Sequence, residues 1–138
     1  GDDIRKIFKL KGYEYKDRLE ILSKYSQFAK YITNQKINII LAVVGMIESP
    51  RIWNRLNIDN YVEIYIKSKI ENIVNLNKKK IYHRKKIGKI IGIDIKPEYP
   101  TNPDITIINS FKSSSDKLSK MLMRKINILL NKKPYNKI

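Results

Sequence analysis

The chain has 138 residues and a mass of 16.3 kDa, which suits a single domain that buries roughly two-thirds of its unfolded surface. It has no cysteine and one histidine, which excludes disulfides, thiolate metal sites, a cysteine nucleophile and any site built from several histidines. The formal net charge is +16, but only six of the 29 basic residues are arginine, and A/T-rich codons specify the abundant Lys, Ile and Asn, so nucleic acid is disfavoured as a partner.

Apolar periodicity predicts helices and strands in alternation along the chain. Residues 17–34 form an amphipathic helical pattern with acidic residues in its first turn. Residues 37–44 are a continuous aliphatic run, which is typical of a parallel strand covered on both faces. A helix that begins near Pro50, a strand over residues 61–66 and a short helix over residues 68–76 follow.

Residues 77–104 interrupt this alternation with two basic clusters and three prolines. A stretch of this length inside a domain predicts a long basic loop or lid. The alternation then resumes with a strand over residues 105–108 and a helix over residues 113–130. The apolar face of this helix is predicted to comprise Leu118, Leu122, Ile126 and Leu129. No apolar run approaches the roughly 18 residues that span a bilayer, so we expect a cytoplasmic protein with no membrane partner.

This order of elements predicts the α/β fold class, with an open, mostly parallel sheet and helices on both of its faces. We expect one domain over residues 1–131, with the lid at residues 77–104 inside it, and a polar tail at residues 132–138. Ligands of such sheets bind beyond the carboxyl ends of the strands.

Six short motifs occur in order along residues 1 to about 110. They are Gly1-Asp2-Asp3-Ile4-Arg5, the Gly-Tyr-x-x-x-Asp-Arg-x-Glu stretch at 12–20, Tyr-Val-Glu-Ile-Tyr-Ile at 61–66, Lys79-x-Ile81-Tyr82, Gly92-Ile93-Asp94 and Pro100-x-Asn102-Pro103-Asp104. Their order and spacing resemble those of the adenylylsulfate kinase family. The resemblance implies a P-loop kinase of sulfate assimilation that moves the γ-phosphoryl group of MgATP to the 3′-hydroxyl of adenylyl sulfate, acting as a homodimer.

The resemblance also implies roles for individual residues. Asp2 matches the acid that orients the attacking hydroxyl and lies near Mg²⁺. Arg5 and Arg18 match arginines that hold the phosphosulfate group, and Tyr13 stands where the family has a phenylalanine that stacks on the substrate base.

Further along the chain, the resemblance adds Ile93 and Asp94 to the substrate site and places Lys79 and Tyr82 in the mobile lid. No residue is assigned to a protein-held metal site.

Each of these residues has a simpler interpretation. Asp2 can cap a helical turn, Arg18 can pair with Glu14 at an i,i+4 spacing, and Tyr13 can serve packing alone. The lysines at 78–80 can form a solvated charge run. Only the ordered motifs raise the functional interpretation to a level that competes with these.

The family's Gly-x-x-Gly-x-Gly-Lys-(Ser/Thr) loop is not present in these residues. The five glycines, at positions 1, 12, 45, 88 and 92, do not make that spacing. Because the chain opens in mid-motif, we expect that a strand–loop–helix unit of about 30 residues is missing. Without this loop we expect the 138 residues to bind MgATP poorly.

Two alternatives stay open. The stretch Trp53-Asn54-Arg55 resembles divergent family members of bacterial capsule biosynthesis, including cytidine diphosphoramidate kinases, which phosphorylate a 3′-hydroxyl on another activated nucleotide. The other alternative is a noncatalytic nucleotide-binding remnant that retains Asp2, Arg5 and Arg18 but no phosphate loop.

Overall fold

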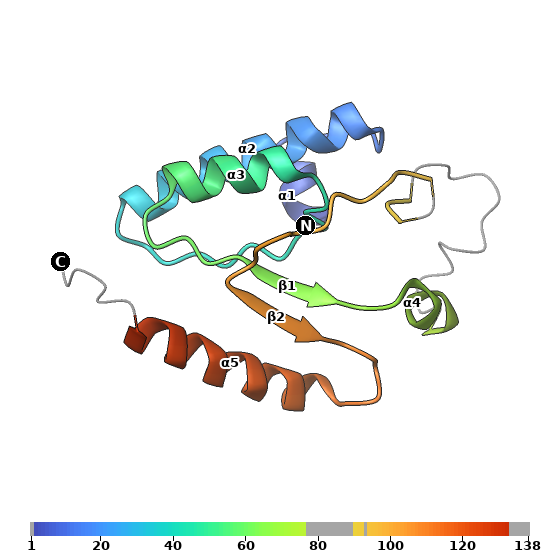
Figure 1. The fold of residues 1–138 in the computed structure, drawn as a ribbon. Coiled ribbons are helices and arrows are strands. Elements are labelled where there is room, and N and C mark those ends of the chain that lie inside the picture. The colour runs from blue at the N-terminus through green and yellow to red at the C-terminus, as the bar shows by residue number, and fades with distance from the viewer. Residues whose placement is uncertain (1, 77–89, 93, 133–138) are drawn as a thin grey trace. The chain divides into compact units, whose positions relative to one another are not determined.

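The computed structural model describes residues 2–76, 90–92 and 94–132 (Figure 1). The chain divides into two compact units. The helical unit comprises Gly1–Tyr61 and Lys86–Pro100, and the sheet unit comprises Val62–Lys85 and Thr101–Ile138.

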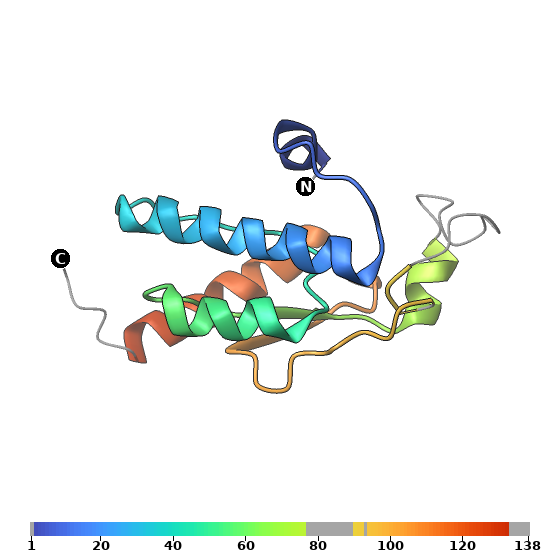
Figure 2. The ribbon, with the colours of Figure 1, turned by 90° about the horizontal axis from the view of Figure 1, so that it is seen from above.

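The helical unit contains α1 (Asp2–Ile7), α2 (Tyr15–Asn34) and α3 (Glu48–Asn57). Helices α2 and α3 lie side by side (Figure 2). Apolar residues spaced three and four apart place one stripe of α2 inside, as the sequence predicts for residues 17–34. The buried apolar residues of this unit are Ile21, Leu22, Tyr25, Ala29 and Ile47.

The start of α2 is fixed by a capping box between Glu14 and Asp17. The Asp17 carboxylate accepts a hydrogen bond from the Glu14 backbone N–H at 3.0 Å, and the Glu14 side chain accepts one from the Asp17 backbone N–H. Each bond satisfies a donor that the helix itself leaves without a partner. The acidic residue predicted in the first turn therefore determines where the helix begins.

The strand predicted over residues 37–44 is wrong. These residues run as extended chain, and among the described residues no strand pairs with them. Their aliphatic side chains stay largely in solvent, with Ile40 95% and Val44 62% exposed. A buried parallel strand needs a hydrogen-bonded neighbour on each side and helices over both faces, and the aliphatic pattern alone supplies neither.

The sheet unit contains β1 (Ile64–Lys67), α4 (Ile70–Leu76), β2 (Ile105–Ile108) and α5 (Ser115–Lys132). Strands β1 and β2 are parallel, as predicted, with Ile64 opposite Ile105 (Figure 1). The Asp104 carboxylate accepts a hydrogen bond from the Glu63 backbone N–H at 2.8 Å, which fixes the two strands in register where they begin. The Asn-Pro-Asp motif therefore has a structural role at this point.

Helix α5 packs against β2. Its half-buried residues are those predicted for its apolar face: Leu118, Leu122, Ile126 and Leu129. On β2, Ile105 and Ile107 are 5% and 2% exposed, whereas the alternate residue Ile108 is 71% exposed. The sheet therefore buries one face of β2 and leaves the other accessible, as the two-residue period of a strand requires.

The predicted basic lid lies partly outside the described residues, because residues 77–89 and 93 are not described. The polar tail at residues 133–138 is outside them as well. The described end of the predicted lid, from residue 90 onward, forms ordered turns, with an isolated bridge between Ile91 and Ile95.

Candidate acceptor-binding site

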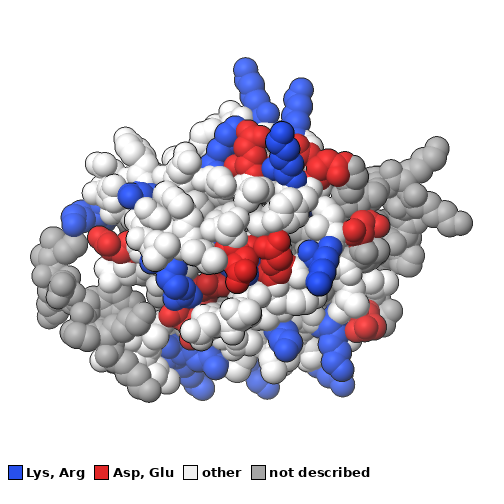
Figure 3. All heavy atoms as spheres, turned by 45° about the horizontal axis from the view of Figure 1, so that its top comes forward, with Lys and Arg blue, Asp and Glu red and all other residues white. Residues whose placement is uncertain are grey.

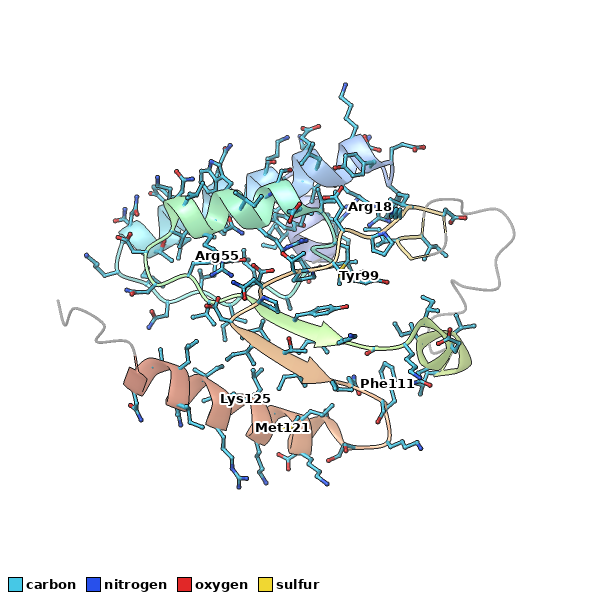
Figure 4. All side chains as sticks on the ribbon, in the orientation of Figure 1. Arg18, Arg55, Tyr99, Phe111, Met121 and Lys125 are labelled. Atoms are coloured by element: carbon cyan, nitrogen blue, oxygen red, sulfur yellow. The ribbon has the colours of Figure 1, made fainter. Side chains whose placement is uncertain are left out.

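Two arginines flank one aromatic ring at the start of α2. The Arg5 guanidinium carbon lies 4.8 Å from the centroid of the Tyr13 ring, and that of Arg18 lies 5.8 Å from it. Figure 4 shows Arg18 beside the first turn of α2. The structure thus brings together three residues that the motifs single out, although Arg5 and Arg18 belong to different helices. We call them the arginine–tyrosine cluster.

The backbone between the two helices holds this cluster in place. Arg5 donates from Nη2 to the Gly12 carbonyl oxygen at 2.7 Å, and Arg18 donates from Nε to the Tyr13 carbonyl oxygen at 2.9 Å. Gly12 has a φ of 87°, which L residues rarely adopt, and a Cβ there would collide with the Asp17 carboxylate. The sharp turn that aims both carbonyls at the arginines therefore requires glycine.

The two guanidinium groups carry the same charge at short range. Partial burial lowers the pKa of Arg18 from its usual value, the positive charge of Arg5 lowers it further, and Tyr13 acts in the opposite direction. An arginine stays protonated at neutral pH in spite of such shifts. The lowered pKa therefore reflects burial first and repulsion by Arg5 second, and a bound anion would offset that repulsion.

Residues 90–95 form a compact turn in the same unit. The Asp94 carboxylate accepts a hydrogen bond from the Ile90 backbone N–H at 2.8 Å, and the backbone N–H groups of Asp94 and Ile95 both donate to the Ile90 carbonyl oxygen. Asp94, which the sequence assigns to the substrate site, therefore also shapes this turn. The assigned Ile93 lies outside the described residues.

Glu98, which the sequence did not single out, joins the segment after residue 95 to α2 and α3. Glu98 accepts hydrogen bonds from the Tyr15 hydroxyl at 3.0 Å and from the Glu48 backbone N–H, and its own N–H donates to the Met46 carbonyl oxygen at 3.0 Å. The hydrogen bond to Glu98 raises the pKa of Tyr15 above its usual value. The only sequence signal is an acidic residue between two prolines, and it does not name these partners.

The family profile for adenylylsulphate kinase matches residues 1–108. The chain belongs to the adenylylsulfate kinase family. Its relatives include the cytidine diphosphoramidate kinase of Campylobacter jejuni, 26% identical over 129 residues, with 91% of this chain and 75% of the relative covered. The adenylyl-sulfate kinase of Pseudomonas aeruginosa is 27% identical over 113 residues, with 78% of this chain and 58% of the relative covered.

The fold of this family member also matches a solved structure. The APS kinase of Mycobacterium tuberculosis, solved in complex with AMPPNP and APS, superposes with a TM-score of 0.77 at 19% identity, covering 91% of this chain and 76% of that one. The predicted α/β class is therefore confirmed. This likeness concerns the fold alone.

Several residues that the family resemblance singles out cannot be placed. Asp2 lies in the backbone of α1, but its side chain is not described, and Lys79 and Tyr82 fall within residues 77–89. The neighbouring Asp3 points into solvent and pairs with Lys6 at 3.7 Å. In the described part of the chain, no three His, Cys, Asp or Glu side chains are grouped so that they could hold a metal ion.

The surface of this kinase-family chain is charged but mixed. On the face shown in the upper part of Figure 3, Lys and Arg side chains alternate with Asp and Glu side chains. On α2, Lys24 and Glu20 form an ion pair whose charged atoms lie 2.7 Å apart. None of the helices in the described ranges combines the length and the hydropathy needed to cross a bilayer.

Proposed function

We propose that this protein is a phosphotransferase that moves the γ-phosphoryl group of ATP to the 3′-hydroxyl of an activated nucleotide, with adenylyl sulfate as the prototype acceptor. The observation that carries the proposal is the arginine–tyrosine cluster of Arg5, Tyr13 and Arg18. Membership of the adenylylsulfate kinase family supports the reaction class.

The chemistry of the cluster suits the anionic part of such a nucleotide. A guanidinium group presents five N–H donors in a plane, which match the oxygens of a phosphate or sulfate in pairs. The bond from Arg5 to the Gly12 carbonyl engages one of these donors and fixes the direction of the group. The anion also offsets the repulsion between Arg5 and Arg18, so binding is favoured by charge as well as by hydrogen bonds.

Tyr13 supplies an aromatic face for a base. Its side chain is 56% exposed, while the two guanidinium groups hold its ring in place. A base that stacks on an exposed aromatic ring gains about 1–3 kcal/mol. In this proposal Tyr13 binds the base, Arg5 and Arg18 bind the anion, and Ile93 and Asp94 belong to the acceptor site, as the family resemblance implies.

The residues of this chain do not provide a binding site for the phosphate groups of the donor, ATP. A cradle for the β- and γ-phosphates needs a glycine-rich loop with a lysine, and no stretch of these 138 residues has that spacing. The described residues also offer no carboxylate cluster for Mg²⁺. The proposal for this chain therefore concerns the acceptor, and we derive no step through MgATP.

A second acceptor, cytidine diphosphoramidate, is favoured by a specific observation. The Campylobacter jejuni kinase named for that substrate aligns with 91% of this chain. The Trp53-Asn54-Arg55 stretch lies on α3, where Trp53 packs against Lys30 and Arg55 against Tyr61. Both acceptors are nucleotides with a modified diphosphate-like group, so the same arginines serve either.

Isothermal titration of the chain with adenylyl sulfate and with cytidine diphosphoramidate tests the proposal. We expect one of them to bind, and Arg18→Ala to weaken that binding by at least about tenfold, because a charge-assisted bidentate contact is lost. Arg124→Ala is the matched control, since Arg124 is an exposed arginine of α5 in the sheet unit. Equal losses in both variants, or no binding by the unsubstituted chain, would overturn the proposal.

The noncatalytic alternative is tested by comparing acceptor binding with ATP binding and with turnover. Acceptor binding without ATP binding, in the protein as its host makes it, would favour a nucleotide-binding remnant. Turnover of either acceptor in that protein would favour the kinase.

A further inference from the structure

Three stretches of the helical unit meet at the side chain and backbone of one residue. Glu98 binds the first residue of α2 through the Tyr15 hydroxyl and the first residue of α3 through the Glu48 N–H. Its backbone N–H binds the Met46 carbonyl oxygen at 3.0 Å. One oxygen of the Glu98 carboxylate is thus bonded to α2 and the other to α3.

These contacts lie next to the arginine–tyrosine cluster. Tyr15 comes two residues after Tyr13 and three before Arg18, so the hydroxyl bond acts on the turn of α2 that carries Arg18. On the other side, Glu98 comes shortly after the turn at residues 90–95, which is closed by its own backbone bonds to Ile90. Glu98 therefore attaches the segment that follows this turn to the start of α2.

We propose that Glu98 is a positioning residue for the acceptor site: it holds the turn at residues 90–95 against the first turns of α2 and α3, and so sets the affinity for the nucleotide. The inference rests on the proposed function, because it assumes that Arg5, Tyr13 and Arg18 bind the acceptor. Glu98 itself is not assigned a contact with the nucleotide.

The physical reason is preorganisation. A site assembled from α1, α2 and a separate segment binds weakly if its parts must be ordered at the moment of binding. A carboxylate that accepts two hydrogen bonds from two different helices restricts these parts beforehand, and bonds to a charged acceptor are stronger than neutral ones.

A simpler role for Glu98 is to cap α3. The Glu48 N–H lies in the first turn of that helix, and a carboxylate there stabilises the helix whether or not a nucleotide binds. Capping alone predicts an effect of Glu98 on stability but none of Tyr15 on affinity. A variant that removes the bond of Glu98 to α2 but keeps its bond to α3 therefore distinguishes the two roles.

The test uses the full chain and three variants. Glu98→Ala removes both bonds, Glu98→Gln keeps one carbonyl acceptor, and Tyr15→Phe removes only the bond to α2 while it keeps the ring. Glu71→Ala is the control, because Glu71 is an exposed acid in the first turn of α4, in the sheet unit. Circular dichroism shows that each variant is folded.

Two readouts are taken on each variant. The first is the dissociation constant for adenylyl sulfate and for cytidine diphosphoramidate by isothermal titration. The second is amide hydrogen exchange at Gly92, Asp94 and Ile95, whose N–H groups donate within the turn. Exchange needs no ligand, so it reports on Glu98 even if neither nucleotide binds.

We expect Glu98→Ala to weaken acceptor binding by about tenfold and to speed exchange at these amides. Tyr15→Phe should weaken binding by a smaller factor and leave the unfolding midpoint unchanged. The loss of affinity in Glu98→Gln should lie between those of Glu98→Ala and Tyr15→Phe. Glu71→Ala should have no effect. Unchanged exchange in Glu98→Ala overturns the proposal, whatever the binding result. Faster exchange with unchanged affinity also overturns it, because the turn is then held for stability alone.

Failure of the unsubstituted chain to bind either nucleotide has a different meaning. It overturns the proposed function, and with it the effect of Glu98 on affinity. The exchange data then still decide whether Glu98 holds the turn.

Discussion

Two aliphatic segments of this chain have similar sequences and opposite fates. Residues 37–44 and Ile105–Ile108 are both rich in β-branched residues, and both are predicted as strands of a mostly parallel sheet. Ile107 is 2% exposed, in a strand that pairs with β1 and packs against α5, whereas Ile40 is 95% exposed in unpaired extended chain. The aliphatic pattern shows that a segment is able to form a buried strand. Whether it does so depends on a strand that pairs with it and a helix that covers it.

The difference lies in what each segment meets. The register of β2 is set at its first residue, where the Ile105 N–H donates to the Glu63 carbonyl oxygen at 3.1 Å, and after its end, where the Asn109 N–H donates to the Lys67 carbonyl oxygen at 2.8 Å. Among the described residues, the first backbone hydrogen bond of this stretch comes after residue 44, where the Met46 carbonyl oxygen accepts from the Glu98 N–H. Aliphatic side chains give no free energy of burial until such contacts bring a neighbour over them.

The largest expected effect compares one isoleucine from each segment. Ile107→Ala should lower the free energy of unfolding by about 2–5 kcal/mol, because it removes buried apolar volume and leaves a cavity. Ile40→Ala should change it by less than about 0.5 kcal/mol, because that side chain is already in water. Urea unfolding followed by circular dichroism measures both.

The result for Ile40→Ala is the one that can break the comparison. A loss close to that of Ile107→Ala would mean that residues 37–44 are covered in solution, by another part of the protein or by a second copy. Concentration dependence of the unfolding midpoint would then separate a second copy from an intramolecular cover.

A pair of glycines sharpens the comparison at the level of the backbone. Gly12→Ala should lower the free energy of unfolding by about 1–2 kcal/mol, because alanine is strained at a φ of 87°, with a further cost from the collision with Asp17. Gly45→Ala, at the end of the exposed segment, should be neutral or stabilise by up to about 1 kcal/mol, since its Cβ would lie 3.4 Å from the nearest Val43 carbon, an ordinary contact.

Acceptor affinity provides a second readout for the same pair. Gly12 supplies the carbonyl that holds Arg5, so Gly12→Ala should also weaken nucleotide binding, whereas Gly45→Ala should not. Equal affinities in the two variants would show that the turn at Gly12 does not set the geometry of the arginine–tyrosine cluster.

The sequence was sufficient to predict a feature where the segment's own pattern determines its bounds or its buried face. The predicted strand at 105–108 has its observed bounds, and the apolar face predicted for α5 is the half-buried one. Arg5, Tyr13 and Arg18 lie within fourteen positions along the chain, and the motif that contains them folds into one cluster. Helix α1 was not predicted, because six residues are too few for a periodic pattern.

Long-range contacts set the limit of prediction. The partners of Glu98 lie 83 residues away at Tyr15 and 50 residues away at Glu48, and the sequence around Glu98 carries no mark of either. The same limit explains the wrong strand at residues 37–44, since strand pairing is decided by residues far along the chain. A sequence reports local propensity well and the presence of distant partners poorly.

The smallest expected effect concerns the point where the exposed segment first gains a partner. Glu98 joins Met46 to Tyr15, and its hydrogen bond raises the pKa of the Tyr15 hydroxyl above the usual value of about 10. Because the folded state binds this proton more tightly than the unfolded state, the bond adds to stability below pH 10 or so, and the contribution is lost as the pH rises through the raised pKa. Alkaline titration of the Tyr15 resonances by NMR should show this raised pKa, and Glu98→Gln should return it toward the usual value. A Tyr15 pKa that does not respond to Glu98→Gln would mean that the bond between the Tyr15 hydroxyl and the Glu98 carboxylate is not formed in solution.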